Sequence, residues 1–133
     1  MIGILIVAHG TLGESLIQCA SHVMGSRPER LRQLGVTIHD DPNALLPQAL
    51  ELVKGLDDGD GVLVLSDMYG ATPSNIACRM LSTGRVEGIS GVNLPMLVRA
   101  LHYRNEPLEI LVERAIAGGV GGVIHITPEA CKA

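Results

Sequence analysis

The sequence predicts an α/β protein with an open, mainly parallel central sheet and helices on both of its faces. Two segments, 4–8 and 62–65, are continuous apolar runs rich in β-branched residues and too short to span a membrane. Such runs are typical of strands buried on both faces of a parallel sheet. Amphipathic segments, with apolar residues three and four positions apart, alternate with strand-like segments along the chain. This alternation is the order expected for parallel strands joined by helices.

The first predicted strand ends at His9, and Gly10 separates it from a predicted helix over 12–24. Thr11 stands where a capping residue is expected, and Gly25 stands where a helix commonly ends. The predicted buried face of this helix consists of Leu12, Leu16, Cys19, Ala20 and Val23.

The rest of the chain continues the same alternation. Further strands are expected over 31–38, 62–65, 87–92 and 123–127, and further helices over 43–55, 73–81, 95–102 and 107–116. Thr72 precedes Pro73 as an expected cap, and the glycine pairs 118–119 and 121–122 are expected to break the last helix. We expect the last strand at an edge of the sheet, antiparallel to its neighbour, and a frayed tail from Pro128.

The 133 residues, of 14.0 kDa, are expected to form a single domain over 1–133. Apolar residues make up 47% of the chain, which is enough for a core without disulfides. Tyr69 and Tyr103 are the only aromatic residues, and the net charge is −4 with no basic stripe. Base stacking and phosphate-backbone binding are both disfavoured, so we expect no nucleic-acid partner.

The three cysteines, Cys19, Cys78 and Cys131, form no CxxC pair. We interpret them as small buried hydrophobic residues in a reducing compartment. The N-terminus lacks the basic segment of a signal peptide, and no stretch approaches the about 20 apolar residues of a membrane helix. We therefore expect a cytoplasmic protein that is not embedded in the membrane.

Two polar side chains of matching chemistry, His9 and Asp67, follow the two apolar strands. If these strands are parallel neighbours, their carboxyl ends meet at one edge of the sheet, where ligands of open α/β sheets bind. Asp67 would then accept a hydrogen bond from Nδ1–H of His9, fix the tautomer and leave Nε2 as an exposed nucleophile. The carboxylate would also stabilise the positive ring that forms when Nε2 attacks an electrophile.

The loops after these two strands favour an anion. Gly10 and Thr11 lead into one helix N-terminus, and Gly70, Ala71 and Thr72 lead into another. Free N–H groups at such termini stabilise negative charge. The sequence has no Walker motif, no G-x-G-x-x-G motif and no acidic cluster for magnesium. The pattern suits a phosphoryl group on a histidine better than a bound nucleotide, and it calls for no cofactor and no metal.

Structural roles explain the same residues one by one. A histidine at a strand end or an aspartate at a strand–helix junction is commonly a capping or packing residue, and Tyr69 could simply cover the sheet edge. A metal site of His9, His39 and Asp40 has no ligand spacing to support it. The functional interpretation is favoured only because His9 follows one predicted buried strand and Asp67 follows the other.

Three motifs resemble a known family. They are Ala8-His9-Gly10, the segment 67–75 with the sequence DMYGATPSN, and the segment 91–97 with the sequence GVNLPML. In this order and spacing they resemble the phospho-accepting histidine motif, the D-x-x-G-G-S-P-x-N signature and the G-x-N-[LI]-P-M-L segment of the mannose-type IIA component of the sugar phosphotransferase system. The related phosphotransferase subunit of dihydroxyacetone kinase shares the fold, but the second and third motifs favour the mannose type.

The resemblance implies that His9 takes a phosphoryl group from the carrier protein HPr and passes it to a IIB protein, with Asp67 orienting the ring. It implies a homodimer, in which the last strand either stays at the edge of its own sheet or crosses to the partner's sheet. Four further residues are expected to line the site or contact a partner: Tyr69, Asn75, Asn93 and Met96.

The chain departs from the family pattern at two positions of the second motif. Ala71 replaces a glycine and Thr72 replaces a serine, so the hydroxyl is kept and a methyl group is added. No segment resembling a IIB domain follows in the given sequence, so we expect the acceptor to be a separate IIB protein or a regulatory protein. A regulator controlled by its own phosphorylation, and a small-molecule or metal-binding domain that uses the same cleft, remain the alternative functions.

Overall fold

The structure is a computed structural model that describes residues 1–132, and its centre is a four-stranded parallel sheet. The strands are β1 (Gly3–His9), β2 (Leu31–Val36), β3 (Val62–Ser66) and β4 (Val86–Ser90). Their order in the sheet is β2-β1-β3-β4, and every neighbouring pair is parallel. The predicted parallel α/β fold is confirmed, as is the pairing of the two long apolar strands.

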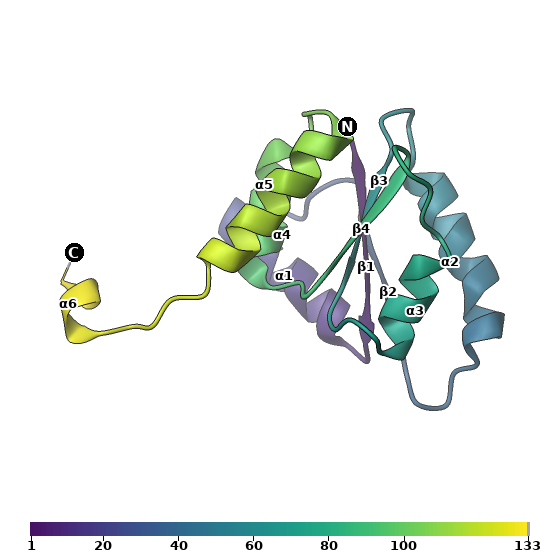
Figure 1. Ribbon diagram of the computed structural model, residues 1–133, viewed down its shortest axis with the longest axis horizontal. Coiled ribbons are helices and arrows are strands. Elements are labelled where there is room, and N and C mark those ends of the chain that lie inside the picture. The colour runs from purple at the N-terminus through teal and green to yellow at the C-terminus, as the bar shows by residue number, and fades with distance from the viewer. Residues whose placement is uncertain (133) are drawn as a thin grey trace.

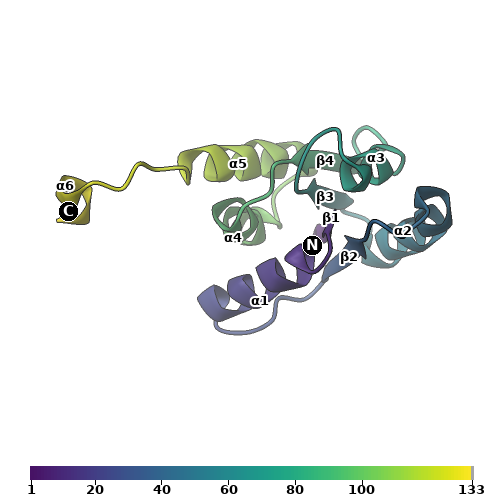
Figure 2. The same cartoon turned by 90° about the horizontal axis from the view of Figure 1, so that it is seen from below.

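Helices cover both faces of the sheet (Figures 1 and 2). One face carries α1 (Leu12–Met24), α4 (Leu94–Tyr103) and α5 (Leu108–Gly121). The other face carries α2 (Pro42–Leu56) and α3 (Thr72–Cys78). A last short helix, α6 (Pro128–Cys131), lies away from the body of the molecule.

The two apolar strands supply both layers of the core in alternation. Ile4, Ile6 and Leu65 pack into the layer beneath α1, α4 and α5, whereas Leu5 and Val64 pack into the layer beneath α2 and α3. Successive side chains of a strand point to opposite faces, so a strand covered on both sides must be apolar at every position. The core is aliphatic, as the composition requires.

Arg104 is buried directly after α4, where its guanidinium group joins three segments of the chain. It donates hydrogen bonds to the carbonyl oxygens of Ile2, Glu29 and Arg30 at 2.6–3.1 Å. Burial lowers the pKa of Arg104. All of these hydrogen bonds go to backbone carbonyl oxygens, and none goes to a carboxylate. The arginine therefore acts as a polar clamp at the end of the sheet where β1 and β2 begin.

The predicted break of the last helix at Gly118 and Gly119 is wrong, because α5 continues to Gly121. The glycines serve close packing against α4. A Cβ atom on Gly118 would lie 2.6 Å from Cβ of Arg99, and one on Gly119 would lie 2.7 Å from Cε of Met96. These glycines allow α4 and α5 to pack closely, and they lie within α5 without ending it.

The predicted last strand over 123–127 does not join the sheet in this chain. The segment runs extended from α5 to α6 and away from the body (Figures 1 and 2). Its large apolar side chains, Val123, Ile124 and Ile126, are exposed. The predicted frayed tail is also wrong, since Thr127 caps α6 by accepting a hydrogen bond from the N–H of Ala130.

Three smaller expectations need correction. Helix α1 buries Gly13, Ile17 and Ala20, whereas Leu12 and Val23 are exposed, because two apolar stripes run along this helix and packing on the sheet selects one. The three cysteines are exposed, not buried. None of the described helices has the length and apolar character needed to cross a membrane.

Candidate functional site

The strand order places the ends of β1 and β3 at the point where the chain connections diverge. From β1 the chain leads to β2 on one side, and β3 and β4 lie on the other side. Open α/β sheets bind their ligands outside the carboxyl ends of the strands at such a switch point. His9 ends β1 and Asp67 directly follows β3, so both residues lie at this position.

His9 and Asp67 are in direct contact. Oδ2 of Asp67 lies 2.7 Å from Nδ1 of His9 and accepts a second hydrogen bond from the backbone N–H of His9 at 2.9 Å. The other carboxylate oxygen accepts from the N–H of Met68 at 2.9 Å. An ionised carboxylate only accepts hydrogen bonds, so the proton of the imidazole ring lies on Nδ1 and Nε2 keeps its lone pair.

The side chain of His9 is much more exposed than that of Asp67. The side chain of His9 is 52% exposed, whereas that of Asp67 is 11% exposed. Burial raises the pKa of Asp67, but the hydrogen bonds from the backbone and ring of His9 outweigh it and hold this pKa below its ordinary value. The carboxylate is therefore ionised and fixed, while the ring reaches solvent.

The turn after His9 is fixed by β2. Gly10 has φ +54°, and its N–H donates to the carbonyl oxygen of Val36 at 2.9 Å. This N–H is consequently not a free donor for an anion, contrary to the expectation for Gly10. The free donors on this side lie in the first turn of α1, after Thr11, whose side chain makes no capping hydrogen bond.

The loop before α3 is held by Ser74, a residue that the sequence analysis missed. The N–H of Gly70 donates to Oγ of Ser74 at 2.8 Å, and the same hydroxyl donates to the carbonyl oxygen of Ala71 at 3.0 Å. Helix α3 begins at Thr72, so Ala71 occupies the cap position and the predicted cap at Thr72 is wrong. The signal available in the sequence was a serine hydroxyl directly after Pro73, within the first turn of the predicted helix.

Exposed apolar side chains follow the strands at the same edge of the sheet as the histidine. Leu12 begins α1 after β1, Ile38 lies in the loop after β2, and Met68 and Tyr69 lie in the loop after β3. Ile38 is 93% exposed and Tyr69 is 81% exposed. Asn75 is also exposed, on the second turn of α3. The half-exposed histidine thus shares its edge of the sheet with several exposed apolar side chains.

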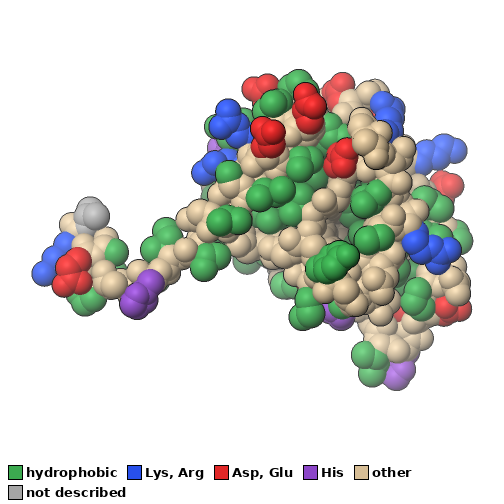
Figure 3. Space-filling model, viewed as in Figure 1, with side chains coloured by type: hydrophobic (Ala, Val, Ile, Leu, Met, Phe, Trp, Pro, Cys, Tyr) green, Lys and Arg blue, Asp and Glu red, His purple; other side chains and the backbone are tan. Residues whose placement is uncertain are grey.

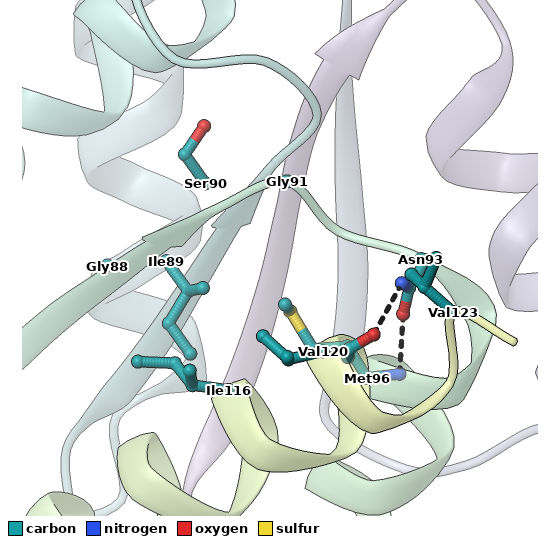
Figure 4. A pocket seen from close by; sticks show the side chains of 10 residues that line it. Gly88, Ile89, Ser90, Gly91, Asn93, Met96, Ile116, Val120 and Val123 are labelled. Carbon is teal, nitrogen blue, oxygen red and sulfur yellow. Dashed lines mark hydrogen bonds between the residues drawn. The ribbon is translucent and has the colours of Figure 1, made fainter.

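Asn93 and Met96 lie at a different place, in a cavity of about 480 Å³ along β4 and α5 (Figure 4). Oδ1 of Asn93 accepts from the N–H of Met96 at 2.9 Å and caps α4, and Nδ2 donates to the carbonyl oxygen of Gly119 at 3.0 Å. Both residues therefore hold α4 against α5. None of these contacts joins Asn93 or Met96 to His9.

Across residues 1–132, no three His, Cys, Asp or Glu side chains form a group that could hold a metal ion. The alternative metal site of His9, His39 and Asp40 is therefore not formed. Asp40 instead accepts hydrogen bonds from the N–H and the hydroxyl of Thr37 at 2.8 and 3.1 Å.

The fold and this edge of the sheet define a class: parallel α/β proteins with an exposed histidine held by an aspartate at the switch point. Comparison with known proteins narrows the class to a family. The family model described as PTS system fructose IIA component matches residues 3–115. The chain therefore belongs to the mannose-type IIA family of the phosphotransferase system, as its motifs suggest.

Individual relatives agree with this assignment. The chain is 32% identical over 125 residues to the PTS system mannose-specific EIIAB component of Escherichia coli K12, covering 92% of this chain and 38% of that protein. It is 28% identical over 116 residues to the transcriptional regulatory protein LevR of Bacillus subtilis, covering 84% of this chain and 12% of that protein. The chain thus spans less than two fifths of the length of these curated relatives.

A solved structure shares the whole fold. The crystal structure of phosphotransferase system component EIIA from Streptococcus agalactiae superimposes with a TM-score of 0.83 and 26% sequence identity. The match covers 94% of this chain and 97% of that one.

Proposed function

We propose that this chain is a phosphocarrier that accepts a phosphoryl group on Nε2 of His9 from phosphorylated HPr and passes it to a IIB protein. The observation that carries the proposal is the 2.7 Å contact between Oδ2 of Asp67 and Nδ1 of His9 on a ring that is half exposed. It leaves one ring nitrogen unprotonated and open to a visiting donor.

The proposed step is an in-line displacement at phosphorus. The lone pair of Nε2 forms the new N–P bond while the N–P bond to the donor histidine breaks, and its electron pair stays on the donor ring. The proton on Nδ1 of His9 remains there, and Asp67 stabilises the positive charge that the ring gains. Catalysis of this kind consists of positioning and electrostatic stabilisation.

The arriving phosphoryl group would lie between two sets of backbone donors. One set is the first turn of α1 after Thr11, and the other is the N–H groups of Ala71 and Thr72 at the start of α3. Each helix terminus stabilises an anion by about 0.3–1 kcal/mol at an exposed site. Gly10 and Gly70, whose N–H groups are already paired, would shape the two loops without binding phosphate themselves.

A protein donor fits this surface better than a small molecule. The ring is half exposed at the edge of the sheet where the exposed side chains of Leu12, Ile38, Met68 and Tyr69 also lie. Exposed apolar side chains grouped in this way mark protein interaction sites, whereas small ligands are generally enclosed in concave pockets. The function makes no use of a cofactor or a metal.

The chain would act as a homodimer. Val123, Ile124 and Ile126 are exposed on the segment between α5 and α6, and β4 is an edge strand of the described sheet. Hydrophobic side chains also gather over α5 and β4 on the face seen in Figure 3, where the cavity of Figure 4 opens. An extended apolar segment from a second copy would cover this edge by adding a strand to it.

The function is tested by mixing the protein with HPr, enzyme I and phosphoenolpyruvate and measuring its mass. The expected result is an acid-labile gain of one phosphate, which is absent from His9→Ala and is lost again when a IIB protein is added. Labelling of His9→Ala to the same extent would refute the assignment of His9.

The similarity to LevR, a transcriptional regulatory protein, supports a second candidate function. In that case the phosphorylated and unphosphorylated forms would differ in affinity for a regulatory partner, and no IIB protein would accept the phosphoryl group. The same labelled protein distinguishes the two, because a regulator keeps its phosphate when a panel of IIB proteins is added.

A further inference from the structure

We infer that Gly35, a residue of β2 outside the family motifs, is a positioning residue that sets the aim of the His9 ring. The inference rests on the proposed function of His9 and deepens it. Gly35 pairs with Ala8 in the register of β1 and β2, and the next residue, Val36, pairs with His9. It therefore lies beside the end of the strand that presents the histidine.

Gly35 has no conformational need to be glycine. It is not among the glycines with positive φ, and a glycine inside a strand weakens that strand. A glycine in such a place commonly marks a site where another stretch of backbone approaches closely. The question is which backbone approaches it here.

The approaching backbone is the turn directly after the histidine. A Cβ atom on Gly35 would lie 2.4 Å from the carbonyl oxygen of Gly10, about 1 Å inside ordinary contact. The same turn is tied to β2 by the hydrogen bond from the N–H of Gly10 to the carbonyl oxygen of Val36. Only a residue without a side chain lets the turn lie this close.

The neighbouring residue on the same face of β2 supports this arrangement. Gln33 is two positions before Gly35, so both face the start of α1. A Cβ atom on Gly13 of α1 would lie 3.0 Å from Cβ of Gln33. The beginning of α1 and the turn before it thus both rest directly on β2.

His9 is consequently held from two sides. Asp67 fixes its ring and its N–H from the side of β3, and the Gly10 turn fixes its carbonyl end from the side of β2. An added methyl group on Gly35 would push the turn outward by about 1 Å while the bonds to Asp67 pull the other way. A displacement of this size can reduce the rate of group transfer by up to about 100-fold.

Gly3 offers a matched control in β1. A Cβ atom there would lie 2.5 Å from the carbonyl oxygen of Leu56 and 2.7 Å from its Cβ, so the clash is at least as severe as the one at Gly35. Gly3 lies at the opposite end of β1 from His9 and is buried. Gly3→Ala therefore tests a strand–backbone clash that does not reach the histidine.

The experiment compares Gly35→Ala, Gly3→Ala and the unaltered protein by two readouts. The first is the rate of phosphoryl transfer from phosphorylated HPr, separated into kcat and KM. The second is the NMR spectrum of the His9 ring nitrogens, recorded without any donor. Gly35→Ala should fold, lower kcat about 10- to 100-fold with little change in KM, and shift the ring signals. Gly3→Ala should lose stability but keep the transfer rate and the ring signals.

Three results would overturn the inference. They are an unchanged kcat with unchanged ring signals in Gly35→Ala, an equal loss of kcat in Gly3→Ala, and failure of Gly35→Ala to fold, since the exposed Gly10 turn is required to yield. If the unaltered protein takes no phosphate from HPr, the proposed function fails. The ring signals of the two variants then decide the positioning role by themselves.

Discussion

The backbone N–H of His9 and its ring nitrogen Nδ1 both contact one oxygen atom, Oδ2 of Asp67, at 2.9 and 2.7 Å. One carboxylate oxygen thus fixes the start of the histidine residue and the end of its side chain together. Rotation of the ring about the side-chain bonds would break the contact between Nδ1 and Oδ2 but would leave the hydrogen bond from the backbone N–H in place.

Replacement of Asp67 should slow phosphoryl transfer without unfolding the protein. Asp67→Asn keeps the size of the side chain but loses the ionised acceptor, so we expect a rate about 10- to 100-fold lower. Quenched-flow measurement of the transfer from phosphorylated HPr gives the rate, and Asp60→Asn, an exposed acid before β3, is the control. Equal rates in Asp67→Asn and the unaltered protein would contradict the orienting role.

Acid should remove the stabilisation that Asp67 supplies. The pKa of Asp67 is lower in the folded protein than its ordinary value of about 3.9, so this contribution is present above that pH and is lost as the pH falls through the folded pKa. Urea unfolding between about pH 6 and about pH 3 should show a steeper loss of unfolding free energy in the unaltered protein than in Asp67→Asn. Parallel pH profiles would show that the pKa of this carboxyl is not lowered by folding.

Arg104 should be a stability residue with no part in transfer. Arg104→Met leaves the carbonyl oxygens of Ile2, Glu29 and Arg30 without their donors in a buried place, and we expect a loss of about 3 kcal/mol in the free energy of unfolding. Arg32→Ala, at an exposed position of β2, should change it by less than about 0.5 kcal/mol. Urea titration measures both values, and similar losses would argue against the clamp.

Two glycines of α5 should respond to alanine with opposite signs. Gly118→Ala places Cβ 2.6 Å from Cβ of Arg99 and should lower thermal stability, although alanine favours helix. Gly121→Ala meets nothing within 4 Å and should raise the free energy of unfolding by about 0.4–1 kcal/mol. Calorimetry of the two variants decides whether close contact with α4 explains the glycines, and a gain in both would rule it out.

The segment between α5 and α6 should control the oligomeric state. Ile124 and Ile126 are two residues apart and both line a shallow apolar hollow with Cys131. Replacing both by serine should shift a dimer toward monomer without lowering the stability of the folded monomer. Sedimentation equilibrium measures the shift, with Val23→Ser at an exposed position of α1 as the control. A dimer of unchanged strength in the double variant would remove the proposed role of this segment.

The sequence predicted the four strands of the described sheet and the His9–Asp67 pair, because these follow from local pattern. Uninterrupted apolar runs identify central strands, and adjacent central strands bring their ends together. The error at Gly118 had a different origin, since the need for glycine there arises from contact with Arg99, which is close in space and not in sequence. The pairing of Gly70 with Ser74 was missed because Thr72 is an equally good capping residue by type.

Contacts in the folded structure also show the structural roles of residues that the motifs alone do not explain. Asn93 belongs to a motif shared with the family, yet its contacts join α4 to α5. Gly35 belongs to no motif, yet it lies against the turn that presents the histidine. The sequence indicates which residue types are unusual, and packing determines what each of them contacts.

His9 and Asp67 are 58 positions apart in the sequence, and this separation has a consequence for biosynthesis. A nascent chain that has left the ribosome as far as α2 contains the imidazole but lacks the strand that carries its carboxylate partner. Because β3 must insert beside β1 before the pair exists, competence to take a phosphoryl group arises only once the centre of the sheet has closed. Under the proposed function, an unfinished or misfolded copy would accept few phosphoryl groups from phosphorylated HPr.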